Sequence, residues 1–528
     1  MIKLFVPFLC MSIATLSASA QTAAPPTFSD VVQQVINRPV YRHALFGIEI
    51  YSLDSQKCLY SLNGDKLFTP GSTTKLLTEG TALQLFGPDY RFHTFLYRTG
   101  EVDSQGELKG DLVLVASGDP NLSNRMQPDG SLAFADEDHS YGGPGSRLVP
   151  GDPLVVINDF ARQIAAAGIK RVRGNVAVDV GLFPEGQREL GTNVVISPIT
   201  LNDNVIDVTI EPGPADGGPA KLTYSGSVPY IHFENRIVTV AGKTSIEDPQ
   251  TTENADGTET VVLSGAVAQT SGPIIYGYPV TSPSHFAAAA LTAALATAGV
   301  QVKGKPETVT DAAKYRNFYQ QQYQVAEHVS APLAEEVKVT LKVSQNLHAS
   351  MTPYVLGAVL GKATAKIDEK GFALEHDFLT TAGLDLSGAA QADGAGGAAS
   401  AYYTPDFMVY YLAYMARQPS FPVFMKALPI LGKDGTLAEI QTDSPAAGHV
   451  FAKTGTFDAM DLLNMQAMLV GKGLAGYTTT VDGQHLAFAL FANHVALPAD
   501  RESLMMAGQA LGEIAAAAYA LPIEASTR

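Results

Sequence analysis

The pattern of apolar and polar residues near the start of the chain predicts two strands followed by a helix. Apolar and polar residues alternate through LFGIEIYSL, DSQK supplies a turn, and CLYSL resumes the alternation, so residues 44–62 are expected to form a β-hairpin. A helical pattern runs from about Thr73 to Leu85 and ends at Gly87-Pro88. Two strands and a helix opened by a Pro-Gly-Ser turn are typical of the entrance to an α/β domain.

The pattern changes after residue 91. Short β-branched runs such as DLVLVA, NVAVDV and RIVTVA are separated by turn residues, and one long helical pattern, DPLVVINDFARQIAAAG, interrupts them. Residues 124–152 are rich in Gly, Pro and Asp, which predicts a long surface loop. Residues 92–279 are therefore expected to be a mainly β insert with its own core.

Helical periodicity returns over residues 283–299 and 331–360. The chain closes with strand patterns in HVFAKTGT, GYTTT and HLAFALFANH, followed by an alanine-rich helix near residues 500–518. The Asp482-Gly483 pair predicts that GYTTTVDGQHLAFALF forms a second hairpin.

The first twenty residues have the pattern of an export signal. Lys3 gives a positive start, an apolar run covers Leu4–Leu16, and Ala18 and Ala20 satisfy the small-residue rule for cleavage before Gln21. The apolar run is too short to span a bilayer comfortably, which makes a retained N-terminal anchor the less favoured alternative. We expect this segment to be removed and the protein to be exported to the periplasm, with no transmembrane anchor and at most loose membrane association.

Cysteine usage and charge exclude some classes of protein. Cys58 is the only cysteine after the export segment, so an internal disulfide is excluded and stability must come from a packed core. The net charge of -17 argues against nucleic acid as a partner, because phosphate binding needs a basic surface.

Three short motifs follow one another along the chain: Ser72-Thr73-Thr74-Lys75, Ser344-Gln345-Asn346 and Lys453-Thr454-Gly455-Thr456. Each alone is weak evidence, because S-x-x-K arises by chance about once in a chain of this length and also fits a capped helix with a surface lysine. The K-T-G triplet alone is more often a turn into a strand. Ser72 is expected at the start of a helix, Ser344 in or beside a helix, and Lys453 on a strand. The three motifs in this order and in these contexts indicate an acyl-serine mechanism.

The first and third motifs suit nucleophilic attack. Ser72 and Lys75 are three residues apart, so they share a face of the first helical turn, where the lysine can take the serine proton. This requires an ammonium destabilised by burial and by a second cation, for which Lys453 is the candidate. The backbone N–H groups of Ser72 and Thr456 are expected to bind the developing oxyanion.

The second motif suits proton transfer and substrate binding. Ser344 offers a hydroxyl that can relay a proton to the leaving amine, and Asn346 offers an amide that can hold the substrate backbone. Lys453 and Thr454 together suit the free carboxylate of a C-terminal residue.

Other catalytic chemistries have no support in the sequence. There is no G-x-S-x-G elbow and no H-E-x-x-H, and none of the 11 histidines has a spacing that indicates a metal site. We expect no metal and no cofactor.

The segments PGSTTK, SQN and KTGT resemble the active-site triplets of penicillin-binding proteins and serine β-lactamases. GDLVLVASGDPNL, GIKRVRGNVAVDVGLF and LAGYTTTVDGQHLAFALF extend the resemblance to the class C low-molecular-mass group, the D-alanyl-D-alanine carboxypeptidase/endopeptidases similar to penicillin-binding protein 4, over nearly the whole mature chain. This resemblance implies an α/β (α+β) transpeptidase/β-lactamase-like domain with an antiparallel sheet flanked by helices. Residues 21–91 and 280–528 would form its two parts, interrupted by the mainly β insert of residues 92–279.

The resemblance also implies the reaction. Ser72 would attack the peptide bond before the terminal D-alanine of peptidoglycan stem peptides, form an acyl-serine intermediate, and be acylated by penicillins. In that family an aspartate of the insert helps bind the amino end of diaminopimelate. Asp179, with Phe183 beside it, matches its motif. A turn residue that closes a strand is an equally supported interpretation of Asp179.

Three departures from the family pattern stand out. Gln345 replaces the usual aspartate, and its side chain is expected to point away from the site. Ala399 replaces the arginine that would bind the diaminopimelate carboxylate, which puts the usual side-chain selectivity in doubt. About ten residues, roughly Asp461 to Gly471, are added after the KTGT motif.

Two rival functions remain open at this point. A β-lactamase or esterase would use the same serine and lysine but release its acyl group faster. A catalytically weak wall-binding protein is the alternative outside the enzymes, and the altered segment of residues 393–401 is the feature that favours it.

Overall fold

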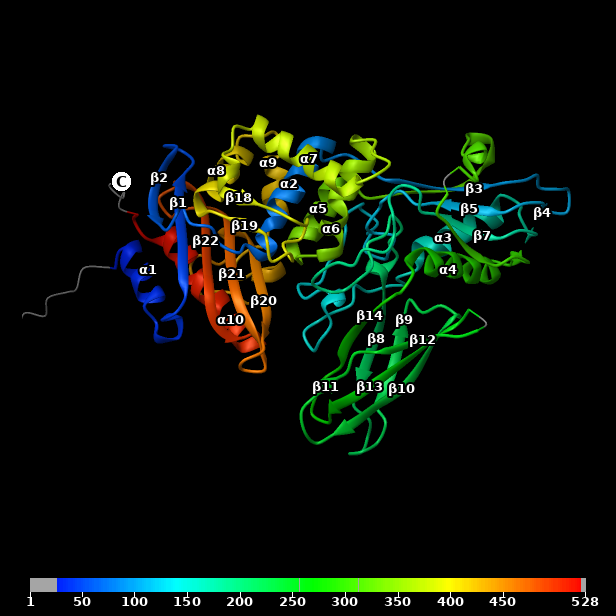
Figure 1. The fold of residues 1–528 in the computed structure, drawn as a ribbon, viewed down its shortest axis with the longest axis horizontal. Helices are drawn as coiled ribbons and strands as arrows, with labels where there is room; N and C mark the ends of the chain where they lie inside the picture. Colours follow the sequence, from blue (N-terminus) through cyan, green and yellow to red (C-terminus); the bar gives the residue numbers. More distant parts are fainter. Residues whose placement is uncertain (1–25, 256, 312, 524–528) are drawn as a thin grey trace, which may run out of the picture.

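The computed structural model describes residues 26–255, 257–311 and 313–523. The proposed export signal of residues 1–20 lies outside the described residues. Figure 1 shows three groups of elements: a sheet with helices on both faces, a smaller α/β group beside it, and a β group that projects away from both. We call the first the main domain and the other two the insert.

The main domain is built on a five-stranded antiparallel sheet with the order β2-β1-β22-β21-β20. Both predicted hairpins are present in it, because the β1–β2 and β21–β22 pairs each join strands that follow one another in the chain. The five strands are β1 Leu45–Ser52, β2 Lys57–Leu62, β20 Val450–Asp461, β21 Gln466–Thr479 and β22 His485–Pro498.

Helices cover both faces of this sheet, so strand residues of either parity are buried. On one face, α1 (Phe28–Ile36) and α10 (Arg501–Ala520) pack against an apolar cluster that includes Leu474 and Leu490. Each such buried side chain contributes roughly 1.5–3 kcal/mol. The opposite face is covered by α2 Lys75–Phe86, α5 Leu333–Lys342, α8 Pro405–Met415 and α9 Phe421–Ala427, while α6 Asn346–Val355 and α7 Ile367–Thr381 lie farther out.

The α/β group of the insert has a five-stranded mixed sheet with the order β16-β7-β5-β3-β17. The predicted helix is present as α3 (Val155–Ala166), which packs against α4 (Pro283–Thr297). The strands of this group are β3 His93–Arg98, β4 Glu107–Leu108, β5 Leu112–Val115, β6 Arg171–Val172, β7 Val176–Asp179, β15 Gln301–Val302, β16 Pro306–Val309 and β17 Gln324–Val329.

The strand pairing favours a later end of the insert than the sequence pattern predicts. β16 is parallel to β7 and β17 is antiparallel to β3, so residues 283–329 share a sheet with residues on the other side of position 280. The predicted return to the main domain at residue 280 would cut this sheet. We propose that the return lies near residue 330, just before α5.

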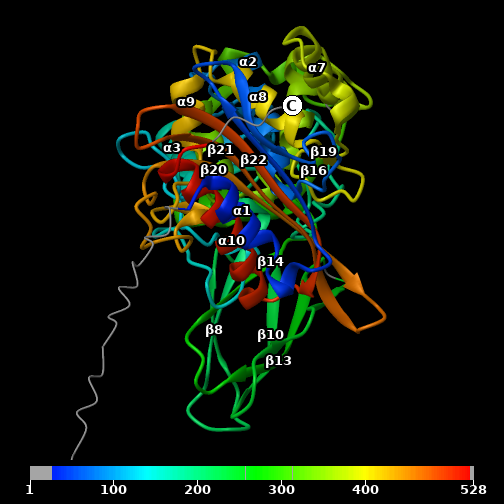
Figure 2. The same ribbon diagram turned by 90° about the vertical axis from the view of Figure 1, so that its left-hand side faces the viewer.

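The β group consists of two small sheets, β14-β8-β9 and a second one in which β10 runs parallel to β13. It projects below the rest of the molecule in both views (Figures 1 and 2). Its strands are β8 Val205–Glu211, β9 Lys221–Ser225, β10 Ile231–Val240, β11 Ser245–Ile246, β12 Gln250–Glu253, β13 Glu259–Ala268 and β14 Ile274–Pro279.

The residues added after the KTGT motif lengthen strands β20 and β21 into a hairpin that projects from the sheet (Figure 2). Its tip exposes four large apolar side chains, those of Met460, Leu462, Leu463 and Met465. Among the helices of the described part of the chain, none combines the length and apolar character needed to cross a bilayer.

Candidate active site

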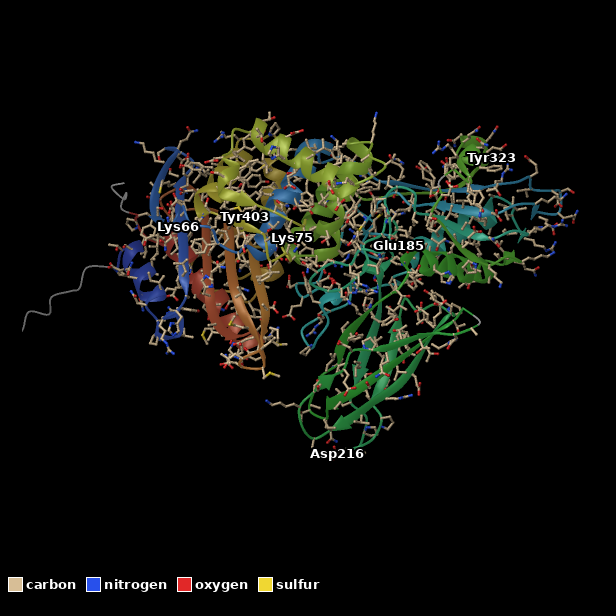
Figure 3. All side chains as sticks on the ribbon, in the orientation of Figure 1. Lys66, Lys75, Glu185, Asp216, Tyr323 and Tyr403 are labelled. Atoms are coloured by element: carbon tan, nitrogen blue, oxygen red, sulfur yellow. The ribbon has the colours of Figure 1, made fainter. Side chains whose placement is uncertain are left out.

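The three sequence motifs meet at one cavity of about 560 Å³ between the main domain and the insert. Ser72, Ser344, Asn346, Thr454 and Thr456 line it directly. Lys75 and Lys453 are fully buried just behind this lining and hydrogen-bond to the two serines. In Figure 3, Lys75 lies at the boundary between the sheet of the main domain and the helices α5 and α6.

The nucleophile candidate Ser72 lies on a tight turn, Gly71–Thr74, that leads directly into α2. The turn packs against β20, where glycine is required: a Cβ on Gly455 would collide with the carbonyl oxygen of Pro70, and a Cβ on Gly71 would lie 2.6 Å from the backbone nitrogen of Thr456. The absence of these side chains lets the serine turn and the edge strand approach each other closely.

Lys75 connects the first two motifs. Its Nζ lies 2.8 Å from Ser72 Oγ, 2.6 Å from Asn346 Oδ1 and 3.1 Å from the carbonyl oxygen of Ala395. The three-residue spacing therefore places the amine against the hydroxyl, as the sequence predicted. The amide oxygen of Asn346 accepts the hydrogen bond from Lys75. Its amide nitrogen lies next to Gly191.

Burial lowers the pKa of Lys75 to about 8, although the carboxylates of Glu189, Asp393 and Glu79 act in the opposite direction. An amine with this pKa is partly neutral near neutral pH and can accept a proton. Burial is the cause that the sequence predicted for this shift.

Lys453 and Ser344 form the second pair. Lys453 Nζ lies 2.8 Å from Ser344 Oγ and 2.9 Å from the carbonyl oxygen of Thr454. Burial, and then the charges of Lys75 and Lys472, hold the pKa of Lys453 well below its usual value. The sequence predicted that the charge of Lys453 lowers the pKa of Lys75. In the structure, the charge of Lys75 lowers the pKa of Lys453.

Ser344 occupies the junction between α5 and α6 and has a left-handed backbone with φ of 64°. This conformation is uncommon for a residue with a side chain and costs about 1 kcal/mol or more, so the surrounding contacts must hold it. One of them is the hydroxyl of Tyr141, from the insert, which donates to the carbonyl oxygen of Ser344.

Gln345 points away from the cavity, as expected, and binds the insert. Its side-chain nitrogen donates to Ser140 Oγ at 2.9 Å and to Asp138 Oδ1 at 3.3 Å, and its side-chain oxygen accepts from the backbone N–H of Leu347 at 2.9 Å. The side chain thus caps α6 and fastens residues 138–141 of the insert to the second motif.

The predicted surface loop of residues 124–152 has one short helical turn, His139–Tyr141, and parts of it are deeply buried. Its charged residues are buried because they pair with one another. The Nη2 of Arg125 lies 2.6 Å from Asp138 and 2.7 Å from Asp203. The prediction of a loop is confirmed, but its placement at the surface is wrong for the buried residues, which include Arg125 and residues 138–140.

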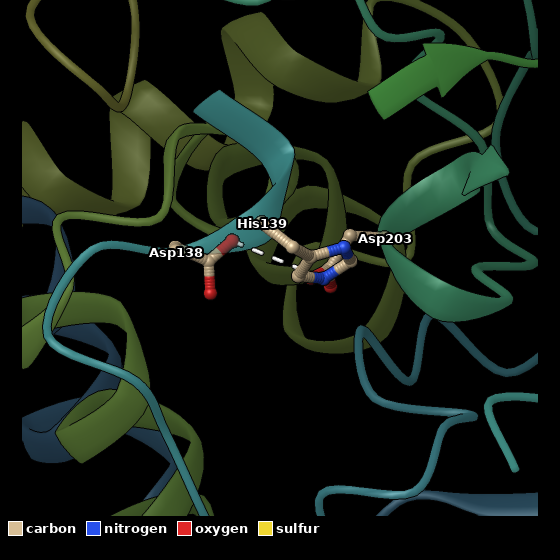
Figure 4. Close-up of side chains that lie close together, drawn as sticks. All are labelled: Asp138, His139 and Asp203. Atoms are coloured by element: carbon tan, nitrogen blue, oxygen red, sulfur yellow. Dashed lines mark hydrogen bonds and ion pairs between the residues drawn. The ribbon is translucent and has the colours of Figure 1, made fainter. Parts of the chain in front are cut away.

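Asp138 and His139 of this loop lie close to Asp203, which belongs to the short helical turn Asn202–Asn204 (Figure 4). The three side chains are spaced as the ligands of a metal ion would be. Burial acts to lower the pKa of His139, but Asp138 and Asp207 outweigh it and hold the pKa well above its usual value. The ring nitrogens lie 2.6 Å from Asp207 and 2.8 Å from Asp203. A protonated histidine donates through both nitrogens and has no lone pair for a metal, so the cluster is better described as an ion-pair network.

Asp179 and Phe183 do not line the cavity. Asp179 is buried at the end of β7, where its carboxylate accepts from the backbone N–H of Gly181 at 2.8 Å and from the hydroxyl of Tyr319. Phe183 is buried in an apolar cluster, with its ring 5.3 Å from that of Tyr354. For Asp179 this geometry matches the alternative interpretation, a turn residue that closes a strand.

The cavity also contains residues that the sequence did not single out. Tyr141 and Glu137 come from the insert, Thr436 follows the last helix before β20, and Lys472 lies on β21. Lys472 could have been found only from the register of the β20–β21 hairpin, which places it directly opposite Thr456. In the altered segment, Ala399 is exposed and away from the cavity lining. The backbone N–H groups of Ala395 and Gly397 donate to Asp393.

The chain is similar to known proteins over most of its length. The profile of the D-Ala-D-Ala carboxypeptidase 3 (S13) family matches residues 29–513. The chain is 26% identical over 520 residues to a D-alanyl-D-alanine carboxypeptidase of Actinomadura sp. (strain R39), covering 94% of this chain and 86% of that protein. It is 22% identical over 482 residues to D-alanyl-D-alanine carboxypeptidase DacB of Haemophilus influenzae, covering 89% of each.

The crystal structure of penicillin binding protein 4 (dacB) from Haemophilus influenzae has the same fold, with a TM-score of 0.70 and 21% identity over 92% of this chain and 98% of that chain. That protein has also been solved in complex with a β-lactam, with a TM-score of 0.67 and 20% identity over the same shares of the two chains. The transpeptidase/β-lactamase-like fold expected from the sequence is confirmed. The family profile covers nearly all of the described residues, and the chain belongs to the D-Ala-D-Ala carboxypeptidase 3 (S13) family.

Proposed function

We propose that the chain is a serine D-alanyl-D-alanine carboxypeptidase/endopeptidase that cleaves peptidoglycan stem peptides through an acyl intermediate on Ser72. The observation that carries this proposal is the 2.8 Å contact between Lys75 Nζ and Ser72 Oγ at the cavity wall, in a chain of the S13 family. A serine hydroxyl needs such a neighbouring base to become a nucleophile.

The first half of the reaction forms the acyl-enzyme. Neutral Lys75 takes the proton of Ser72 as Oγ attacks the carbonyl carbon before the terminal D-alanine. The backbone N–H groups of Ser72 and Thr456 stabilise the oxyanion. The C–N bond then breaks, and the hydroxyl of Ser344, held by Lys453, passes its proton to the departing amine. The proton that Lys75 took from Ser72 replaces it on Ser344, which leaves Lys75 neutral again.

The second half restores the enzyme. A water molecule gives a proton to neutral Lys75 and attacks the acyl ester. The C–O bond to Ser72 breaks, Ser72 Oγ takes that proton back from Lys75, and the shortened peptide leaves with a new carboxylate. The same steps cleave a cross-link when the departing amine belongs to a second stem peptide, which is the endopeptidase reaction. The Haemophilus influenzae protein of the same fold forms a complex with a β-lactam. This supports penicillins as acylating agents of Ser72.

Labelling with a fluorescent penicillin tests the nucleophile. We expect one covalent adduct on the wild-type chain, mapped to the peptide that contains Ser72, and none on the variant Ser72→Ala. Ser55→Ala, which alters an exposed serine, is the matched control and should label normally. An adduct that persists for many minutes favours the peptidase, whereas rapid release of hydrolysed penicillin favours a β-lactamase. The absence of any adduct on the wild-type chain would favour a wall-binding protein.

We also infer export to the periplasm, with cleavage before Gln21. The charged start, apolar run and small residues of positions 1–20 support this inference. N-terminal sequencing of the mature protein tests it, and a mature chain that still begins at Met1 would contradict it.

A further inference from the structure

The cavity contains a third lysine, Lys472, that the proposed reaction does not use. It lies on β21 directly opposite Thr456 of β20, and its Nζ lies 2.7 Å from Thr456 Oγ1. Lys472 is half-buried and lines the cavity. Its ammonium therefore faces the groove that the substrate must occupy.

The register of the sheet decides which groups share a face with this lysine. Directly opposed residues of an antiparallel pair place their side chains on the same face, so Thr456 and Lys472 point together, and Thr454 shares their face two residues away. Leu474, opposite Thr454, packs in the cluster against α10, which identifies this as the α10 side. Lys453, one position from Thr454, points to the other face.

The amine of Lys453 already has two hydrogen-bond partners. Its Nζ is held by Ser344 Oγ and the carbonyl oxygen of Thr454, and it is fully buried behind the cavity lining. A buried amine with two such partners is poorly placed to meet an incoming anion. The sequence-based assignment of Lys453 to the substrate carboxylate therefore lacks geometric support.

Lys472, in contrast, has no ion pair with a carboxylate among the described residues, and its Nζ donates to the neutral hydroxyl of Thr456. The acidic residues of the insert that line the cavity are engaged elsewhere. Glu137 pairs with Arg501, Asp138 pairs with Arg125, and Asp136 accepts from the backbone N–H of Gly435. Burial is the cause that lowers the pKa of Lys472 to about 8, with no carboxylate opposing it.

The hydroxyls of Thr436, Thr454 and Thr456 line the same cavity as this ammonium, and so does Asp458 of β20. Thr454 Oγ1 donates to Thr436 Oγ1 at 2.8 Å, and both threonines line the cavity beside Thr456. An ammonium with hydroxyl donors around it is the donor set that a carboxylate prefers, because charge-assisted hydrogen bonds are the strong ones.

The chemistry of the proposed substrate supplies such a carboxylate at this place. The C-terminal carboxylate of a departing D-alanine is three bonds from the scissile carbonyl carbon, so the two carbons lie no more than about 4.3 Å apart. When that carbonyl is attacked by Ser72 with its oxygen at the N–H of Thr456, the carboxylate must bind beside Thr454 and Thr456.

We propose that Lys472 is the cation that binds the terminal carboxylate of the substrate, together with the hydroxyls of Thr454 and Thr456. Lys472 thereby determines the requirement for a free C-terminus. This assignment rests on the proposed function. Lys453 instead holds Ser344 for proton transfer.

The test compares two substrates in each protein: an acylated peptide ending in D-alanyl-D-alanine with a free carboxylate, and the same peptide ending in D-alaninamide. The readout is the ratio of kcat/KM for the acid over the amide, in which differences in the amount of folded enzyme cancel. We expect the wild type to prefer the acid and the variant Lys472→Gln to lose about thirtyfold of that preference, as for removal of one charged hydrogen bond. Lys472→Arg, which keeps the charge, should retain most of it.

An unchanged acid-over-amide ratio in Lys472→Gln would overturn the assignment, and so would an equal loss on both substrates. A wild type that releases neither D-alanine from the acid nor D-alaninamide from the amide, and takes no penicillin on Ser72, would instead overturn the proposed function, and the carboxylate assignment with it. Penicillin labelling of Ser72 in each variant separates these cases, because it reports the nucleophile independently of peptide turnover.

Discussion

The side-chain amide of Gln345 donates to the hydroxyl of Ser140, 2.9 Å away, and so joins the second catalytic motif to the insert. The same amide faces Asp138 at 3.3 Å. The aspartate that the family usually has at this position would place a second negative charge near the carboxylate of Asp138. The amide at 345 is therefore matched to the acidic loop that it contacts.

This contact predicts a charge-dependent defect in Gln345→Glu. The variant keeps the size of the side chain but places a carboxylate against Asp138, so we expect slower acylation by penicillin and a loss of stability on the order of 1–3 kcal/mol. The defect should be larger at pH 8 than at pH 5, where protonation of one carboxyl relieves the repulsion. Gln345→Met removes the hydrogen bonds without adding charge and is the control; its defect should not change with pH. Equal pH profiles for the two variants would contradict this interpretation.

The close approach of the serine turn to β20 predicts that Gly455→Ala is nearly inactive. Its Cβ would collide with the carbonyl oxygen of Pro70, which must move and take Ser72 with it. A displacement of this kind costs about 100-fold in rate, and the acylation rate constant with penicillin measures it. Gly242→Ala is the matched control, because a Cβ at Gly242 meets no atom within 4 Å. A fully active Gly455→Ala enzyme would mean that the turn and the strand are less tightly packed than the structure shows.

The two lysines with a pKa of about 8, Lys75 and Lys472, predict opposite effects of pH. Lys75 must be neutral to accept the proton of Ser72, so kcat should rise as the pH passes through about 8. Lys472 must be charged to bind a carboxylate, so KM for a peptide with a free C-terminus should rise over the same range. A pH series of kcat and KM measures both. For the amide-terminated peptide only the rise in kcat is expected, and a parallel rise in its KM would count against the role of Lys472.

Much of the main domain was predictable from local patterns. The hairpins β1–β2 and β21–β22 and the helices α2 and α10 follow from alternation, periodicity and turn residues that lie next to one another in the chain. The site could be predicted because spacing fixes geometry within a helical turn: Ser72 and Lys75 meet without any long-range information.

Features that depend on how strands and charged residues pair were missed. β16 and β17 pair with β7 and β3 across more than a hundred residues, and this pairing is the reason we propose an insert that ends near residue 330. Lys472 belongs to no motif, and its place in the cavity depends on the register of β21 against β20. The loop of residues 124–152 was predicted to lie at the surface because it is rich in Gly, Pro and Asp. The sequence does not reveal that Arg125 pairs with Asp138 and Asp203, which allows these charges to be buried.

Burial of Glu79 on α2 predicts that folding stability falls as the pH rises. Burial raises the pKa of this carboxyl to about 8, although the Thr352 hydroxyl and Lys75 act in the opposite direction. An unfolded chain binds fewer protons than the folded one between about pH 4.5 and 8, so this stabilisation is complete below pH 4.5 and is lost as the pH passes through about 8. The contribution is on the order of a few kcal/mol.

The variant Glu79→Gln should abolish this part of the pH dependence. Thermal midpoints at pH 5 and pH 8 measure it, and the wild type should lose more stability between the two than the variant does. Glu502→Gln, at an exposed position of α10, is the control and should follow the wild type. Identical pH profiles for Glu79→Gln and the wild type would show that Glu79 is ionised in the folded state.

The replacement of the family arginine by Ala399 predicts weak discrimination at the third residue of the stem peptide. A methyl group cannot pair with a carboxylate, and Ala399 is exposed and away from the cavity lining. Lys472 does not substitute for the arginine in this assignment, because its ammonium lies on the leaving-group side with Thr456. We therefore expect kcat/KM for stems with amidated and free-acid diaminopimelate to differ by less than about tenfold, or about 1.4 kcal/mol. A larger preference in competition assays would require another cationic group near the acyl side of the substrate, and Ala399→Arg should then leave the preference unchanged instead of increasing it toward the free acid.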